Sequence, residues 1–137
     1  MYVRQDDYGP HPYVTNVEQM AMENSNYRTA IWTGEHVQMT LMCIPPCGDI
    51  GPEMHGDVDQ VIRVEHGRGM VSMGRNQCRQ DFQENLCRGD VVFVPAGTWH
   101  NVINTGRCPL SLSSVYAPPN HPRGTVHRTK AEAEKKN

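Results

Sequence analysis

The chain has neither a long apolar run nor a strong charge of one sign. None of its apolar segments approaches the roughly 20 residues that a transmembrane helix needs, and the first residues, MYVRQDDYGP, lack the apolar centre of a signal peptide. The formal net charge of −2 provides no basic surface for nucleic acid or an anionic membrane. We therefore expect a cytoplasmic protein that binds neither nucleic acid nor a membrane.

Cysteine is present, but it lacks the spacing of a structural framework. The cysteines are five, an odd number, and no two are spaced as Cys-x-x-Cys. This pattern argues against a zinc finger and against a disulfide scaffold. We interpret them as free thiols in a reducing compartment. They are Cys43, Cys47, Cys78, Cys87 and Cys108.

Long helical patterns are also scarce, whereas turn residues are frequent, with 12 Gly and 10 Pro. They separate short apolar runs, a pattern typical of an all-β sandwich or barrel. Residues 27–33 and 37–44 predict a hairpin, and residues 60–67 and 69–74 predict a second strand pair. Further strands are expected near Phe82 and over residues 90–97, 99–106 and 110–117.

The two ends of the chain differ from this strand pattern. Val17, Met20 and Ala21 have helical spacing after Asn16, a candidate N-cap, so we predict one short helix there. Residues 119–137 are rich in Pro and then charged, which is typical of an extended arm or a frayed tail. We expect one domain over residues 1–137, with a barrel core at about 25–118 and residues 1–24 packed outside it.

Residues 89–104, GDVVFVPAGTWHNVIN, contain the most specific pattern in the chain. It consists of Gly89, five residues, Pro95-x-Gly97, two residues, His100, three residues and Asn104. With average amino-acid composition, the expected number of chance matches to the Gly and Pro positions alone is about 0.03 in a chain of this length. The tight Pro95-x-Gly97 turn places His100 at a fixed point near the start of the next strand.

This stretch and residues 47–67, CGDIGPEMHGDVDQVIRVEHG, resemble the two sequence motifs of the cupin superfamily, G(x)5HxH(x)3–4E(x)6G and G(x)5PxG(x)2H(x)3N. The second motif matches at every defined position. In the first, Glu53-x-His55 stands at the His-x-His pair and Gln60 at the glutamate, while the leading glycine is displaced by one residue. An alternative register, with His55-x-Asp57 at the pair, fits the spacing to Gly67 less well.

The resemblance implies a jelly-roll β-barrel, also called a double-stranded β-helix. It is closest to small single-domain cupins that are often described as mannose-6-phosphate isomerase-like. Such proteins usually pair, because an open sheet has edges to cover. The resemblance therefore implies a homodimer, with the N-terminal segment and the Pro-rich arm as candidate exchange elements.

The resemblance also implies that Glu53, His55, Gln60 and His100 surround one divalent transition metal. Two imidazoles and a carboxylate suit Fe, Mn, Ni, Zn or Cu and leave positions for water or substrate. Gln60 offers a neutral oxygen, as a weak ligand or as a hydrogen-bond donor behind the ligands. We expect Asn104 to stabilise the end of its strand rather than to bind anything.

Three hypotheses for function follow from the resemblance. The first is a metal-dependent enzyme acting on a sugar or a hydroxy- or keto-acid, in which Glu53 moves a proton in isomerase, epimerase or lyase chemistry. The second is a non-haem iron dioxygenase with an apolar pocket, for which Met39, Leu41, Ile62 and Phe93 are candidates. The third is a binding module without turnover. His121 and His127, in the arm, are candidates to fold over the barrel mouth and supply an acid or base.

Overall fold

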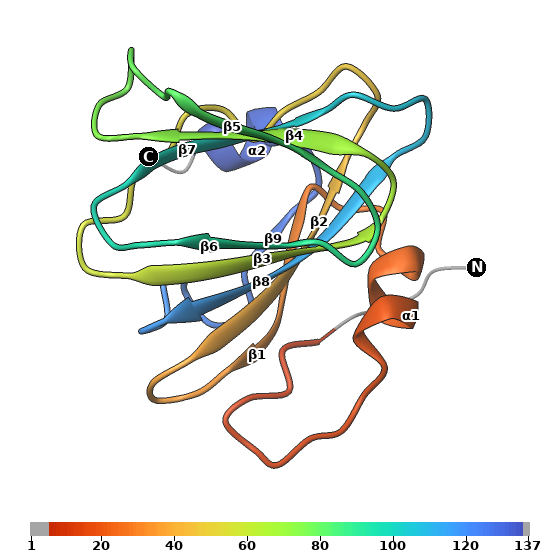
Figure 1. Ribbon diagram of the computed structural model, residues 1–137. Coiled ribbons are helices and arrows are strands. Elements are labelled where there is room, and N and C mark those ends of the chain that lie inside the picture. The colour runs from red at the N-terminus through yellow and green to blue at the C-terminus, as the bar shows by residue number, and fades with distance from the viewer. Residues whose placement is uncertain (1–5, 136–137) are drawn as a thin grey trace.

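The computed structural model describes residues 6–135, and most of its regular structure is β-strand (Figure 1). The two helices are α1 (Val17–Glu23) and α2 (Lys130–Glu134). The predicted all-β fold with a short N-terminal helix is confirmed. The strands are β1 (Arg28–Thr33), β2 (Gln38–Ile44), β3 (Asp59–His66), β4 (Gly69–Gly74), β5 (Phe82–Leu86), β6 (Val91–Val94), β7 (Trp99–Asn104), β8 (Leu110–Ala117) and β9 (Val126–His127).

Two antiparallel sheets face each other as the layers of the barrel (Figure 1). The larger has the strand order β6-β3-β8-β2-β1-β9, and the smaller has the order β5-β4-β7. Alternate residues of both sheets point inward, as the two-residue period of a strand requires. Ile62 and Val64 of β3 thus meet Val71 of β4 and Val102 of β7 in one buried core.

The predicted hairpin of β1 and β2 is confirmed, because the two strands pair from Arg28 with Met42 to Thr33 with Gln38. The predicted pairing of residues 60–67 with 69–74 is wrong. Strand β3 pairs with β6 and β8, whereas β4 pairs with β5 and β7 in the other sheet. The chain therefore crosses between layers at Gly67, although the local pattern of two strands and a glycine turn is also that of a hairpin.

Helix α1 lies on the outside of the larger sheet. Its N-cap is Asn16, whose side chain accepts a hydrogen bond from Gln19 N at 2.9 Å, as the sequence predicts. Ala21 packs against Ile31 and Leu41 in a second, smaller apolar cluster. Within residues 6–135, no helix is long and apolar enough to cross a membrane.

The C-terminal arm has more structure than the sequence indicates. Strand β9 pairs with β1, with Arg28 opposite His127, and so extends the larger sheet by one edge strand. Lys130–Glu134, expected as a charged tail, forms α2 instead. Lys130 Nζ lies 2.5 Å from Asp49 Oδ1, and Ala133 packs against the core, so tertiary contacts hold this short helix in place.

Asp7 connects the N-terminal segment, strand β1 and the arm. Its carboxylate accepts hydrogen bonds from Gly9 N, from both Thr33 N and Thr33 Oγ1, and from Gly124 N. Burial alone would raise the pKa of Asp7, but these hydrogen bonds outweigh it and lower the pKa below its ordinary value of 3.8. The ionised carboxylate therefore stabilises the fold.

We expect Asp7→Asn to lower the free energy of unfolding by about 2 kcal/mol at neutral pH, because one amide oxygen cannot replace two ionised acceptors. Since the folded-state pKa is depressed, the stabilisation is present above pH 3.8 and is lost as the pH falls through the folded-state value. Urea unfolding at several pH values measures this difference. Asp81→Asn, at an exposed position, is the control. A wild type and an Asp7→Asn variant of equal stability at pH 7 would contradict the role of Asp7.

Gly67 is required where the chain crosses between the sheets. Its φ is +98°, and a Cβ there would lie 3.0 Å from Pro109 O and 3.1 Å from Leu110 Cα. We expect Gly67→Ala to destabilise the fold by about 1–3 kcal/mol. The control is Gly56→Ala, since a Cβ at Gly56 would meet nothing within 4 Å. Thermal unfolding of both variants checks this, and equal melting temperatures would refute it.

Candidate metal centre

A pair of backbone hydrogen bonds brings the two sequence motifs together. Glu53 N donates to His100 O, and His100 N donates to Glu53 O, both at 2.9 Å. Farther along β7, Ile50 N donates to Val102 O at 3.0 Å, so residues 50–53 run beside this strand. Gly97 N also donates to His55 O at 2.8 Å, which ties the tight turn to the first motif. The backbone therefore sets the positions of both motifs relative to each other.

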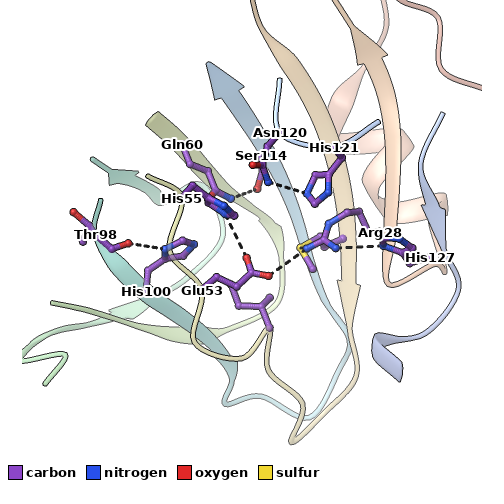
Figure 2. A network of polar contacts seen from close by, with 12 residues as sticks. Arg28, Glu53, His55, Gln60, Thr98, His100, Ser114, Asn120, His121 and His127 are labelled. Atoms are coloured by element: carbon purple, nitrogen blue, oxygen red, sulfur yellow. Dashed lines mark hydrogen bonds and ion pairs between the residues drawn. The ribbon is translucent and has the colours of Figure 1, made fainter. Parts of the chain in front are cut away.

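Three side chains converge from these two segments. The ligand atoms of Glu53, His55 and His100 all lie within 4.8 Å of one another. His55 Nε2 lies 3.6 Å from Glu53 Oε2, and the two imidazole centroids are 5.6 Å apart (Figure 2). The Nε2 atoms of His55 and His100 are both buried without a hydrogen-bond partner. Buried polar atoms are normally satisfied, so this pair of lone atoms indicates room for a shared ligand.

The backbone holds His100 ready to be a ligand. Its Nδ1 lies 3.2 Å from Thr98 O, and because a carbonyl only accepts, Nδ1 carries the proton and Nε2 has the free lone pair. Burial lowers the pKa of His100, and this outweighs the hydrogen bond to Thr98 and the charge of Glu53, which raise it. His100 is therefore neutral near pH 7, as a metal-binding imidazole must be.

Glu53 supplies the only negative charge among these three side chains. Burial would raise the pKa of Glu53, but the nearby His55 ring and the charge of Arg28 outweigh it, so the pKa lies below its ordinary value. Arg28 Nη2 lies 3.6 Å from Glu53 Oε1, while Oε2 faces His55. The carboxylate is therefore ionised and stands between the histidines and a buried arginine (Figure 2).

Gln60 occupies the position next to this group that the sequence predicts. It lies near the start of β3 with 3% of its surface exposed, and Figure 2 shows it beside His55. Its Nε2 donates to Ser114 Oγ at 3.3 Å, and its Oε1 is buried without a partner. The amide oxygen is therefore available as a fourth donor, and its role as a ligand stays a prediction.

The structure also distinguishes between the two registers of the first motif. Asp57 is exposed and does not belong to the group, whereas Glu53 and His55 do. Asn104 acts as the sequence predicts at its strand end. Its Nδ2 donates to Ile44 O and Cys108 O, and its Oδ1 accepts from Gly106 N. Asn104 thus stabilises the turn after β7 at a distance from the site.

The C-terminal arm forms one wall of a cavity of about 950 Å³, which Glu53 and His55 also line. Gln38, fully buried on β2, holds the arm in place. Its Oε1 accepts from Asn120 N and His121 N, and its Nε2 donates to His121 O. His121 and His127 both line this cavity, so the arm covers the site of its own chain.

Burial gives His121 an unusually low pKa. Its ring lies edge-on to Tyr116, with the centroids 5.2 Å apart, and removal from water together with the positive charge of Arg28 lowers the pKa of His121 to about 3. His121 is therefore neutral near pH 7. The sequence indicated the arm histidines as candidates, but no sequence pattern indicated Gln38 or Arg28, because a single polar residue in a strand usually faces solvent.

Comparisons with known proteins agree with this fold. The sequence profile of the Cupin family matches residues 8–134. The protein YrkC of Bacillus subtilis is 55% identical over 127 residues, which cover 93% of this chain and 68% of that protein. This chain therefore belongs to the cupin family, whose motifs the sequence resembles.

Solved structures show the same fold. The crystal structure of BH2720 from Bacillus halodurans has a TM-score of 0.94 and 52% identity, and the match covers 95% of this chain and 98% of that one. KdgF from a Halomonas species has a TM-score of 0.61 and 15% identity, covering 85% and 96% of the two chains. At that identity the likeness shows the fold alone. A jelly-roll cupin with a candidate His/Glu metal site is thus established for this chain.

Proposed function

We propose that this chain is a metal-dependent cupin enzyme that acts on a small polar metabolite. The observation that carries the proposal is the pair of buried, unpartnered Nε2 atoms of His55 and His100 beside the ionised Glu53. Satisfied histidines of a structural core would have hydrogen-bond partners at these atoms. An adjoining cavity of about 950 Å³ has room for a substrate as well as an ion.

The donor set fits a divalent transition metal. Two imidazole nitrogens, one carboxylate and one amide oxygen match the preferences of Fe, Mn, Ni, Zn or Cu, and the ion would be held by Glu53, His55, His100 and Gln60. When bound, such an ion polarises a carbonyl or hydroxyl group of the substrate as a Lewis acid. The same chemistry serves a sugar and a hydroxy- or keto-acid.

Proton transfer would fall to side chains of this chain. The carboxylate of Glu53 is ionised and is within reach of the cavity, so it can accept a proton from the substrate. A carboxylate with a low pKa is a weak base. It can therefore remove a proton only from a substrate group that is already acidic. The neutral imidazole of His121 also lines the cavity, but its pKa of about 3 makes it a weak base near pH 7.

The dioxygenase is the alternative within the same site, and the cavity lining favours it less. Of the residues expected to make an apolar pocket, Ile62 is buried in the core inside the barrel, whereas Met39 and Leu41 pack with α1 on the outside of the sheet. Phe93 is 69% exposed.

A binding module without turnover uses the same ligands. Iron accompanied by oxygen uptake would favour the dioxygenase, and zinc, nickel or manganese without uptake would favour the first proposal.

We also propose a cytoplasmic homodimer. Five cysteines without a disulfide, within the part of the chain that the structure describes, support a reducing compartment. Strand β6 ends the larger sheet with Val91 and Phe93 exposed, and edges of this kind are commonly covered. Sedimentation of the purified protein tests the dimer, and a monomer at micromolar concentration would refute it.

We expect the purified protein to carry a divalent metal, and His100→Ala and Glu53→Ala to reduce the bound amount at least about tenfold. Removing either donor leaves fewer ligands, and removing Glu53 also takes away the negative charge that attracts the ion. Elemental analysis by mass spectrometry measures metal per chain, and circular dichroism verifies folding. His36→Ala, at an exposed histidine outside the group, is the matched control. Unchanged metal content in both site variants would show that the ion, if present, is bound elsewhere.

Gln60 allows a finer test of the same site. We expect Gln60→Glu to bind the metal about tenfold more tightly than the wild type, because it adds a carboxylate, and Gln60→Leu to bind it about tenfold more weakly. Titration of chelator-stripped protein measures the affinities. Gln77→Glu adds the same charge at an exposed position and should change nothing. Equal affinities for all three residues at position 60 would remove Gln60 from the ligand set.

A further inference from the structure

Arg28 is a buried cation in the wall of the cavity, and it lies beside Glu53, one of the candidate metal ligands. It begins β1, and only 5% of its side chain is exposed. Its Nη1 lies 3.3 Å from His127 Nδ1, its carbon Cζ lies 5.3 Å from the centroid of the Tyr27 ring, and its Nε is buried without a partner. Because a guanidinium only donates, His127 Nδ1 is an acceptor, so this contact brings no negative charge.

The charge of Arg28 is incompletely balanced. Within residues 6–135, the only carboxylate recorded within 4.0 Å of its guanidinium is Glu53, at 3.6 Å, which is beyond hydrogen-bond distance. Glu53 is also the only carboxylate in the candidate metal site. One carboxylate cannot neutralise both a divalent ion and a guanidinium, and an unbalanced buried charge is costly.

We propose that Arg28 binds a carboxylate group of the substrate, so that the substrate is a short carboxylic acid rather than a neutral sugar. This inference rests on the proposed function, since it uses the charge that a bound ion takes from Glu53. The carboxylate enters from the cavity and completes the hydrogen bonding of the guanidinium, for which planar oxyanions are the matching partners.

The geometry limits the size of such a substrate. The two oxygens of Glu53 face opposite partners, Oε2 toward His55 and Oε1 toward Arg28 (Figure 2). The candidate ligands and the guanidinium are therefore separated by a single carboxylate group. A molecule of two to four carbons, roughly, spans such a gap with one oxygen toward the ligands and its carboxylate toward Arg28.

A planar carboxylate fits this site better than a phosphate. A phosphate carries more charge and takes up more donors, whereas Arg28 is the one buried guanidinium facing this site in the described residues. Arg123 also lines the cavity, but its Nε and Nη2 already donate to Gly9 O and Asp7 O. A second basic cleft exists elsewhere, lined by Arg68, Arg88 and Arg107, but these three arginines are exposed, whereas Arg28 is buried.

Calorimetric titration of metal-loaded protein with two acid–amide pairs tests the proposal. The pairs are glycolate with glycolamide and pyruvate with pyruvamide, which differ in charge and hardly in shape. We expect the acids to bind the wild type at least about tenfold more tightly than the amides. Arg28→Met should abolish this preference, and Arg28→Lys should restore only part of it, because lysine keeps the charge but loses the planar fork.

Three further measurements make the outcome decisive. Arg107→Met, in the second basic cleft, should bind the acids as the wild type does, and a loss there would place the anion in that cleft instead. Metal content is measured on every variant, because Arg28→Met should retain the ion. Absence of metal from the wild type would refute the proposed function, while a preference for acids that depends on Arg28 in metal-free protein would still support the anion site.

Other results would overturn the role of Arg28. Equal binding of acid and amide by the wild type would do so without any variant, even if Arg28→Met failed to fold. Loss of metal together with an unchanged preference for acids in Arg28→Met would show that Arg28 only positions Glu53. Inorganic phosphate binding more tightly than both acids, and losing affinity in Arg28→Met, would replace the carboxylate with a phosphate.

Discussion

The two hydrogen bonds between the backbones of Glu53 and His100 are the contact on which the site depends. They join a loop to a strand that lies some fifty positions later in the chain, and they place two candidate ligands opposite each other before any side chain is considered. The turn at Gly97, whose φ of +78° glycine adopts readily, and the hydrogen bond from Gly97 N to His55 O act together with them. The backbone of the jelly roll therefore sets the spacing of these two residues.

A second layer of contacts closes the site from the other side. Gln38 on β2 holds the arm at His121, and Asp7 holds it at Gly124, so residues from both ends of the chain meet around β1. The arm removes His121 from water, which explains its low pKa, and it confines Arg28 between His127 and Glu53. Burial thus keeps His121 neutral, while the charges around Glu53 keep its carboxylate ionised.

The site was largely predictable from the sequence because its motifs are local in spacing. The Pro-x-Gly turn and His100 lie in one short stretch, and Glu53 and His55 lie two residues apart, so a pattern of residues could locate them. The crossing at Gly67 was not predictable, because a hairpin and a passage between sheets begin with the same turn chemistry. Helix α2 was not predictable either, since its five residues are too few to be stable without Asp49 and the core.

The sequence by itself determined the fold class, the limits of most strands and the identity of the candidate ligands, since each of these follows from periodicity, turn residues or a motif. Only the tertiary structure decided which strands share a sheet, which register of the first motif meets His100, and that Arg28, Gln38 and the arm surround the same cavity. The physical reason is that burial and charge balance depend on residues distant in the chain. An arginine at the start of a strand becomes a buried cation only when a sheet, a loop and an arm exclude water around it.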